Sequence, residues 1–152
     1  MSILNDYITK NLIFLDVEIT EQKELLEYMA KCLHESGNVN EIFIKEVVNR
    51  EQKFPTGLQI EDIGVAIPHS DIEHVNNPAV AMAVLKEPVG FYSMENSEKI
   101  VAVNIVFMLA INDGNKQLEL LQEITSLIQS KDTMNNIIKA DTKEEILENI
   151  NL

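Results

Sequence analysis

Residues 100–111 read Ile-Val-Ala-Val-Asn-Ile-Val-Phe-Met-Leu-Ala-Ile, an apolar run broken only by Asn104. An apolar run without polar alternation is typical of a central strand that is covered on both faces. The run is also too short to cross a bilayer as a helix. We therefore predict a sheet with helices packed against both of its faces, and work outward from this strand.

Four shorter strands are predicted before the central run. They cover residues 12–18, 63–67, 80–85 and 89–91, with a turn at 86–88. Pro68 ends the second of them, because proline lacks the N–H group that a strand ladder requires. Residues 53–62 contain a proline and a glycine, so this segment is predicted to be a loop.

Helical periodicity predicts five helices around these strands. They cover residues 21–36, 41–50, 116–130, 133–139 and 142–150. Thr20 and Asn40 are predicted to cap the first two helices. Thr142 and Glu145 form a capping-box pattern at the start of the last one. In the third helix, Leu118 is placed on the apolar side that faces the core.

The alternation of helices and strands predicts an α/β fold. We expect a mixed parallel/antiparallel sheet of about five strands, flanked by helices on both faces. Charged residues are spread throughout and no linker or repeat is present, so residues 1–152 are predicted to form a single domain. In such sheets, functional groups gather beyond the carboxyl ends of strands.

The composition narrows the function classes. A formal net charge of −13 is unfavourable for a broad nucleic-acid interface, so no nucleic-acid partner is expected. The single cysteine, Cys32, fits a reducing cytosol and is predicted to be a buried small hydrophobe. Residues 1–7 are too polar for a secretory signal. We predict a soluble, cytoplasmic chain without direct membrane insertion.

His69 follows the strand over 63–67, directly after Pro68. A side chain there is held by rigid backbone at the rim of the sheet, where it can meet partners. A neutral imidazole is a good nucleophile near pH 7, and it can accept a phosphoryl group and later release it. A surface or capping role is the alternative for this position. His74 is predicted to be a loop histidine rather than a metal ligand.

Arg50 lies at the end of the helix over 41–50, and Thr56 and Gly57 follow in the loop. The guanidinium donors match phosphate oxygens, and Thr56 adds a hydroxyl and an amide beside a glycine that allows close approach. Phosphoryl transfer requires such groups, because its catalysis is mostly positioning and charge stabilisation. The alternative is that Arg50 interacts with the negative end of its own helix.

Taken together, these segments resemble the active-site region of a known family. They are Arg50-Glu51, Pro55-Thr56-Gly57 and Ala66-Ile67-Pro68-His69-Ser70, and the similarity continues through 77–80, 87–91 and 117–121. The chain is similar in them to the type-2 enzyme IIA (EIIA) domains of the sugar phosphotransferase system (PTS), the fructose–mannitol–galactitol family. The resemblance implies a phosphotransferase with a phosphohistidine intermediate.

The resemblance also implies the partners and the site residues. His69 would be the phosphorylated histidine, with Arg50 stabilising the phosphoryl group and Thr56, Ser70 and Gln117 supporting it. The donor would be the histidine-containing phosphocarrier protein HPr, and the acceptor a cysteine of an enzyme IIB unit. The membrane unit IIC would be served indirectly, and IIB and IIC are expected on separate chains. No cofactor and no metal are expected.

One departure from the family pattern concerns the sugar. Fructose and mannitol members usually carry a second active-site histidine at the start of the late helix, where this chain has Gln117. Glutamine can donate a hydrogen bond to a phosphoryl oxygen but cannot titrate. The chain therefore resembles the galactitol branch most closely, and a role in galactitol uptake is predicted. A fructose- or mannitol-specific IIA and a regulatory IIA-like domain of the nitrogen-system type are the alternatives.

Overall fold

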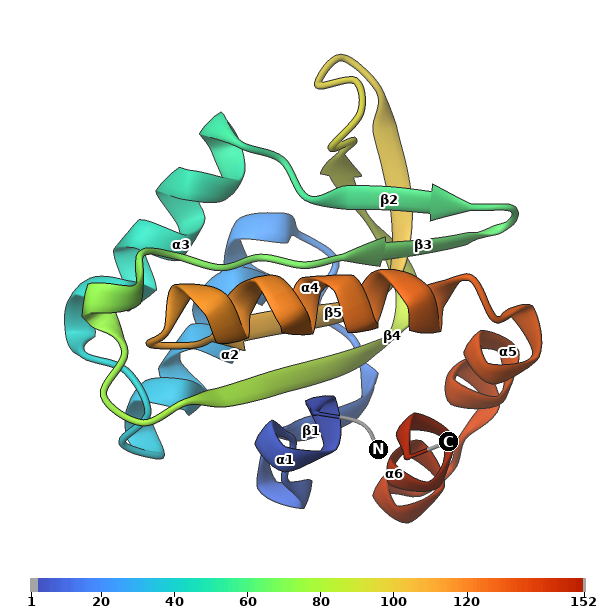
Figure 1. Cartoon of the computed structure of the whole chain (residues 1–152). Coiled ribbons are helices and arrows are strands. Elements are labelled where there is room, and N and C mark those ends of the chain that lie inside the picture. The colour runs from blue at the N-terminus through green and yellow to red at the C-terminus, as the bar shows by residue number, and fades with distance from the viewer. Residues whose placement is uncertain (1–2, 152) are drawn as a thin grey trace.

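The computed structural model describes residues 3–151, so the first two residues of the polar opening segment lie outside it. Its five strands are β1 (Ile13–Val17), β2 (Gly57–Ile60), β3 (Ile63–Ala66), β4 (Ala79–Tyr92) and β5 (Ile100–Ala110). They form one sheet in the order β1-β4-β5-β3-β2 (Figure 1). The pairs β1–β4 and β3–β5 are parallel, whereas β2–β3 and β4–β5 are antiparallel. The predicted mixed sheet is confirmed.

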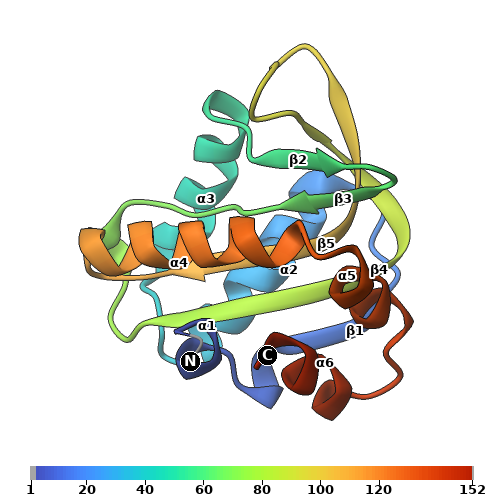
Figure 2. The same cartoon turned by 45° about the vertical axis from the view of Figure 1, so that its right-hand side comes forward.

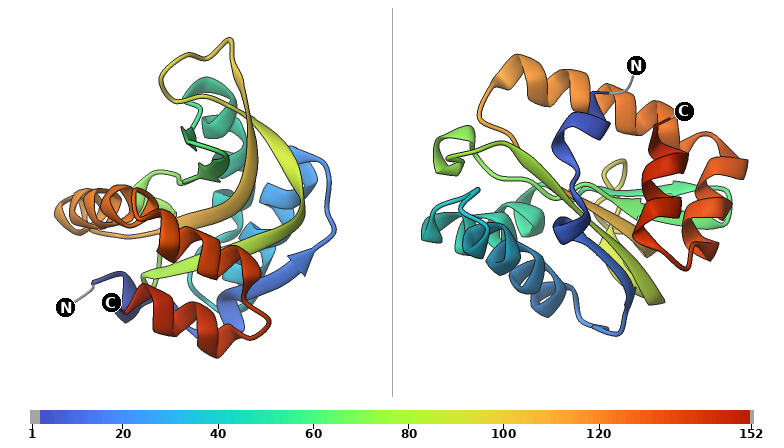
Figure 3. Two further views of the ribbon diagram at one scale, coloured as in Figure 1. Left: turned by 90° about the vertical axis from the view of Figure 1, so that its right-hand side faces the viewer. Right: turned by 90° about the horizontal axis from the view of Figure 1, so that it is seen from below.

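Helices cover both faces of this sheet, as predicted. They are α1 (Leu4–Tyr7), α2 (Gln22–Glu35), α3 (Glu41–Lys53), α4 (Gly114–Ile128), α5 (Lys131–Lys139) and α6 (Lys143–Ile150), with short 3-10 turns η1 (Lys10–Leu12) and η2 (Ile72–His74). The apolar sides of α2 and α3 pack on one face, and those of α1, α4, α5 and α6 pack on the other. Figure 2 and the right panel of Figure 3 show the sheet between these two layers. Between residues 3 and 151 no helix is long and apolar enough to cross a membrane.

The two layers explain why the central strand is apolar at almost every position. Successive side chains of a strand point to opposite faces, so neighbours such as Val106 and Phe107 enter different cores. Val106 packs with α2 and α3, and Phe107 packs with α4. Burial on both faces requires apolar residues at odd and even positions of the strand alike, which is the pattern that the sequence shows.

The one polar residue within β5 has a specific partner. The side-chain oxygen of Asn104 accepts a hydrogen bond from the amide of Gly64 in β3, at 3.0 Å. Gly64 is buried against the backbone of Ala102, and a Cβ at this position would collide with the Ala102 carbonyl oxygen. The Asn104 hydrogen bond therefore joins β3 to β5 at a point where the two backbones lie too close for a side chain at position 64.

The prediction of a loop over 53–62 is wrong in part. Gly57–Ile60 forms β2, which pairs with β3 through a two-residue turn in which Glu61 has a φ of 55°. A segment of four residues next to a proline carries too little periodicity to be recognised, and it becomes a strand through its pairing. The helix before it is longer than predicted, since α3 ends at Lys53 and Arg50 lies in its last turn.

The prediction of two separate strands over 80–85 and 89–91 is also wrong. A single strand, β4, covers both, with a register shift against β5 between Val84 and Val89. The irregular stretch includes Pro88, which a regular ladder would not accommodate. The long β4–β5 hairpin that results projects beyond the sheet at the top of Figure 1.

Two of the three predicted N-cap residues form a capping hydrogen bond. Asn40 accepts from the Phe43 amide, and Thr142 accepts from the Glu145 amide. The cap at Thr20 is wrong, because α2 begins at Gln22 after Glu21, whose side chain makes no capping bond.

Two side chains of the helical layers are more exposed than predicted. Leu118 does not face the core, since it is 58% exposed near the start of α4. Cys32 is only half-buried, although it packs against the α2–α3 core.

We expect Gly64→Ala to lower the free energy of unfolding by about 2 kcal/mol or more, because the new methyl group would meet backbone atoms that cannot move aside. Urea denaturation of the purified protein measures this change. Gly114→Ala is the matched control, since its Cβ would meet nothing within 4 Å; it should leave stability within about 0.5 kcal/mol or raise it. Equal effects of the two substitutions would contradict the close approach of β3 and β5.

Candidate active site

The carboxyl ends of β3 and β5 meet at one edge of the sheet because the two strands run parallel and adjacent. Beyond β3, the Leu109 amide donates to the carbonyl of Pro68 at 2.9 Å, and His69 pairs with Leu109. Strand β5 ends at Ala110, and Asp113 then caps α4 by accepting from two of its first amides. The segment after β3 and the first turn of α4 therefore lie together, at the left of Figure 1.

The imidazole of His69 is half-buried and held by its own backbone. Its Nδ1 lies 2.9 Å from the carbonyl oxygen of Ile67. A carbonyl can only accept, so Nδ1 carries the hydrogen and Nε2 keeps its lone pair. Burial lowers the pKa of His69 below its usual value. The Ile67 carbonyl opposes this effect, Arg50 adds to it, and Asp71 opposes it. The ring is therefore neutral at pH 7, with Nε2 as the nitrogen available to react.

Arg50 reaches this region from the last turn of α3. Its Nη1 donates to Asp71 at 3.2 Å, and its guanidinium carbon lies 5.4 Å from the centre of the Phe54 ring. Its Nε is buried and has no hydrogen-bond partner among residues 3–151. A buried N–H group without a partner lowers the stability of the fold, so an acceptor that reached this atom would bind favourably.

A pocket of about 340 Å³ lies beside this guanidinium. It is lined by Arg50, Ser70, Asp71, Ile72, Glu73 and Gln117. Three of the five predicted site residues thus share one cavity, and the Arg50 charge acts on a fourth, His69. Gln117 lines the pocket too, and its side-chain oxygen is buried and lacks a partner in the described part of the chain. Ser70 is buried in the wall.

Thr56, the fifth predicted residue, does not line this pocket. It is buried, and its amide and hydroxyl both donate to the carboxylate of Glu51, each at 2.8 Å. The Thr56 hydroxyl oxygen also accepts from the amide of Ile67 at 3.0 Å. Both donors that the sequence assigned to a phosphoryl group therefore have an internal partner, and Thr56 contacts the His69 segment through Ile67.

Glu51 is the residue that the sequence interpretation missed. It is only 3% exposed, and burial raises its pKa to about 7 against the opposing effect of its two hydrogen bonds from Thr56. The signal was present, because Phe43, Val47 and Glu51 recur at intervals of four on the buried side of α3. A carboxylate on the apolar stripe of a helix indicates a specific internal partner.

A group of possible metal ligands lies nearby. Asp71, Glu73 and His74 place ligand atoms within 4.8 Å of one another. Asp71 and Glu73 are exposed, and Asp71 is in an ion pair with Arg50. His69 does not belong to this group.

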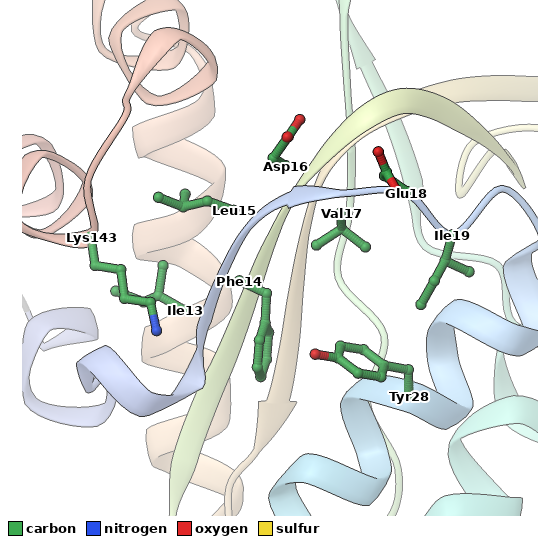
Figure 4. Close-up of a pocket in the computed structure, with 9 residues that line it drawn as sticks. All are labelled: Ile13, Phe14, Leu15, Asp16, Val17, Glu18, Ile19, Tyr28 and Lys143. Carbon is green, nitrogen blue, oxygen red and sulfur yellow. The ribbon is translucent and has the colours of Figure 1, made fainter.

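A larger pocket, of about 450 Å³, lies along β1 at the edge of the sheet (Figure 4). It is lined by Ile13, Phe14, Leu15, Asp16, Val17, Glu18, Ile19, Tyr28 and Lys143. The rings of Phe14 and Tyr28 meet edge to face, 5.4 Å apart. Asp16 has a φ of 52°, which interrupts the pairing of β1 and places a charge on the edge strand. None of the five predicted site residues lines it.

The raised pKa of Glu51 predicts that the free energy of unfolding depends on pH. A carboxyl that titrates near pH 7 in the folded chain and near 4.5 in the unfolded chain binds more protons when folded. The contribution of this carboxyl to the free energy of unfolding is therefore lost as the pH rises from about 5 to 8, and the loss is roughly 3 kcal/mol in total. Relative to the wild type, Glu51→Gln should gain stability over this range in urea denaturation. Parallel pH profiles would contradict the buried carboxyl, since His69 titrates in both proteins.

Similarity to known proteins extends over nearly the whole chain. Residues 6–152 match the family described as phosphoenolpyruvate-dependent sugar phosphotransferase system, EIIA 2. The chain is 28% identical over 152 residues to the PTS system fructose-specific EIIABC component of Bacillus subtilis (strain 168). That match covers 97% of this chain but 23% of the relative, so the chain spans about a quarter of that protein's length.

Two further proteins match over most of their own length. The chain is 25% identical over 122 residues to the PTS system galactitol-specific EIIA component of Escherichia coli (strain K12), covering 80% of this chain and 81% of the relative. The crystal structure of the nitrogen regulatory protein IIA-Ntr from Neisseria meningitidis matches at a TM-score of 0.83 and 25% identity, over 98% and 99% of the two chains. The family match and the shared fold agree with the sequence motifs, and the chain belongs to the EIIA type 2 family of phosphotransferases of the phosphoenolpyruvate-dependent sugar phosphotransferase system.

Proposed function

We propose that this chain carries a phosphoryl group on His69, accepting it from HPr and passing it to a cysteine of an enzyme IIB unit. One observation carries the proposal. A neutral imidazole with Nε2 free lies next to a pocket lined by Arg50, whose Nε is buried and has no partner among residues 3–151. A nucleophile and an unsatisfied phosphate-matching donor are the two groups that a phosphoryl carrier needs.

In the first step, the Nε2 lone pair attacks the phosphorus of the donor phosphohistidine. The new P–Nε2 bond forms as the donor P–N bond breaks, and the donor ring leaves with the electron pair. The His69 ring gains positive charge, which the hydrogen bond from Nδ1 to the Ile67 carbonyl stabilises. In the second step, a cysteine thiolate attacks the phosphorus, the P–Nε2 bond breaks, and His69 returns to its neutral form.

Arg50 would hold the phosphoryl oxygens during both steps. Its present partner, Asp71, is exposed, so the ion pair is weak and readily exchanged. A phosphoryl group would take the place of Asp71 as the acceptor of Nη1, and its several oxygens match the bidentate geometry that guanidinium favours. Gln117 lines the same pocket, and the N–H groups of its amide would add donors to the phosphoryl oxygens.

The surface around the site fits a protein partner. Phe54, Ile72 and Leu118 are large apolar side chains that are 63%, 42% and 58% exposed. They come from the end of α3, from η2 and from α4, and so surround the pocket on three elements. Exposed apolar groups around a polar centre are typical of protein interfaces. The EIIABC name of the Bacillus relative supports IIB as one of these partners.

His69→Ala should abolish phosphoryl transfer from HPr and leave the fold intact, because the variant lacks the only proposed acceptor nitrogen. Incubation with phosphoenolpyruvate, enzyme I and HPr, followed by intact-mass analysis, measures the incorporated phosphate. His74→Ala is the matched control, since it removes a half-buried histidine five residues later and should still be phosphorylated. Phosphate on the His69→Ala protein would refute the assignment.

For the sugar, we propose galactitol. The glutamine at position 117 supports this branch over fructose and mannitol, and the galactitol-specific relative matches this chain over 80% of its length. A regulatory role is the second candidate, because the nitrogen regulatory protein IIA-Ntr shares the fold at a TM-score of 0.83. A cytoplasmic location remains a prediction from the composition.

A reconstituted relay distinguishes these possibilities. The phosphorylated chain should transfer to a galactitol-specific IIB cysteine at least about tenfold faster than to fructose- or mannitol-specific IIB units, a difference of about 1.4 kcal/mol in transition-state binding. Rapid-quench measurement of phosphocysteine gives the rates. A faster transfer to another IIB unit would assign the chain to that sugar. Phosphorylation from HPr without transfer to any of the three would favour the regulatory role.

A further inference from the structure

A continuous chain of hydrogen bonds links a buried carboxylate of α3 to the imidazole of His69. The Glu51 carboxylate accepts from the amide and the hydroxyl of Thr56. The Thr56 hydroxyl oxygen accepts from the Ile67 amide, and the Ile67 carbonyl accepts from Nδ1 of His69. Each link is between 2.8 and 3.0 Å long. Apart from His69, the linked residues are buried.

The link through Thr56 occupies the point where the strand ladder ends. The last paired residues of β2 and β3 are Gly57 and Ala66. Ile67 follows beyond the last β2–β3 pair, and Pro68 has no N–H group to donate. The Thr56 hydroxyl takes the place of the next backbone acceptor. It therefore sets the orientation of the Ile67 amide, while the Leu109 amide holds the carbonyl of Pro68.

Glu51 sets the orientation of the Thr56 hydroxyl. A hydroxyl has one hydrogen and two lone pairs and can rotate to suit its neighbours. Because its hydrogen points to the carboxylate, a lone pair is left for the Ile67 amide. Burying a carboxylate destabilises the fold unless it has strong partners, so this residue carries a cost that an apolar side chain would avoid. A role in holding the reactive segment accounts for that cost.

We propose that Glu51 and Thr56 are positioning residues that hold the Ile67 backbone so that its carbonyl retains the hydrogen of His69 on Nδ1 and leaves Nε2 unprotonated. Their effect on phosphoryl transfer rests on the proposed function of His69. Their effect on the tautomer of His69 does not, since it is a property of the resting protein.

Ring ¹⁵N chemical shifts of His69 report the tautomer directly, and the His69→Ala protein identifies its signals. The wild type should show a protonated Nδ1 and an unprotonated Nε2. Thr56→Val removes the hydroxyl at nearly constant volume and should give a mixture of both tautomers. Thr56→Ser keeps the hydroxyl and is the matched control, with shifts like those of the wild type. The same order should appear in the rate of phosphoryl acceptance, with a loss of about tenfold or more in Thr56→Val.

Glu51→Ala should act in the same direction, because the Thr56 hydroxyl then loses the acceptor that orients it. Gln52→Ala is its control, as an exposed neighbour on the same helix. Backbone amide spectra verify that each variant is folded, and if Glu51→Ala is not, the isosteric Thr56→Val carries the test. A folded Thr56→Val protein with the shifts and the rate of the wild type would overturn the inference and leave the proposed function standing.

Failure of the proposed function can be told apart from failure of the positioning role. If HPr phosphorylates no form of the protein but Thr56→Val still changes the tautomer of His69, the proposed function is wrong and the positioning role stands. A wild type with the hydrogen on Nε2 would overturn the positioning role at once, whatever the rates.

Discussion

The parallel pairing of β3 with β5 is the constraint on which the site depends. It places His69 beside Leu109 at the carboxyl end of the central strand, and it places the start of α4 next to the same edge. Parallel neighbouring strands have their carboxyl ends at the same edge of the sheet, so the residues that follow the two strands lie close together. The fold tolerates this close pairing only because Gly64 lacks a side chain and Asn104 satisfies its amide.

His69, the proposed phosphoryl carrier, is held by backbone contacts more than by neighbouring side chains. The Pro68 and Ile67 carbonyls are both engaged, one by Leu109 and one by the His69 ring. Such contacts order the ring before any partner arrives, which reduces the entropy lost in reaching the transition state. Arg50 is different, because it lies in an exposed ion pair with Asp71, which the proposed phosphoryl group would replace. The candidate site thus combines an imidazole fixed by the backbone with a cation in an exposed ion pair.

Much of the fold was accessible from local patterns. The apolar run over 100–111 predicted a doubly covered sheet, and the caps at Asn40 and Thr142 follow from short-range chemistry. The errors have a common cause. Strand β2 and the continuous β4 depend on pairing with distant strands, and no window of the sequence contains that information. Leu118 was assigned to the apolar side of α4, but the buried stripe of this helix is Leu120, Ile124 and Ile128, and at 3.6 residues per turn Leu118 points away from it.

By itself, the sequence determined the class of fold, the family motif and the residues that could carry the chemistry, since these follow from periodicity, residue type and order along the chain. Only the tertiary structure decided what those residues contact. It gave Arg50 and Gln117 a shared pocket, and it turned Thr56 away from that pocket toward Glu51. The reason is physical, because burial and hydrogen-bond partners arise from segments far apart in the chain, and a spacing along one strand or helix does not contain them.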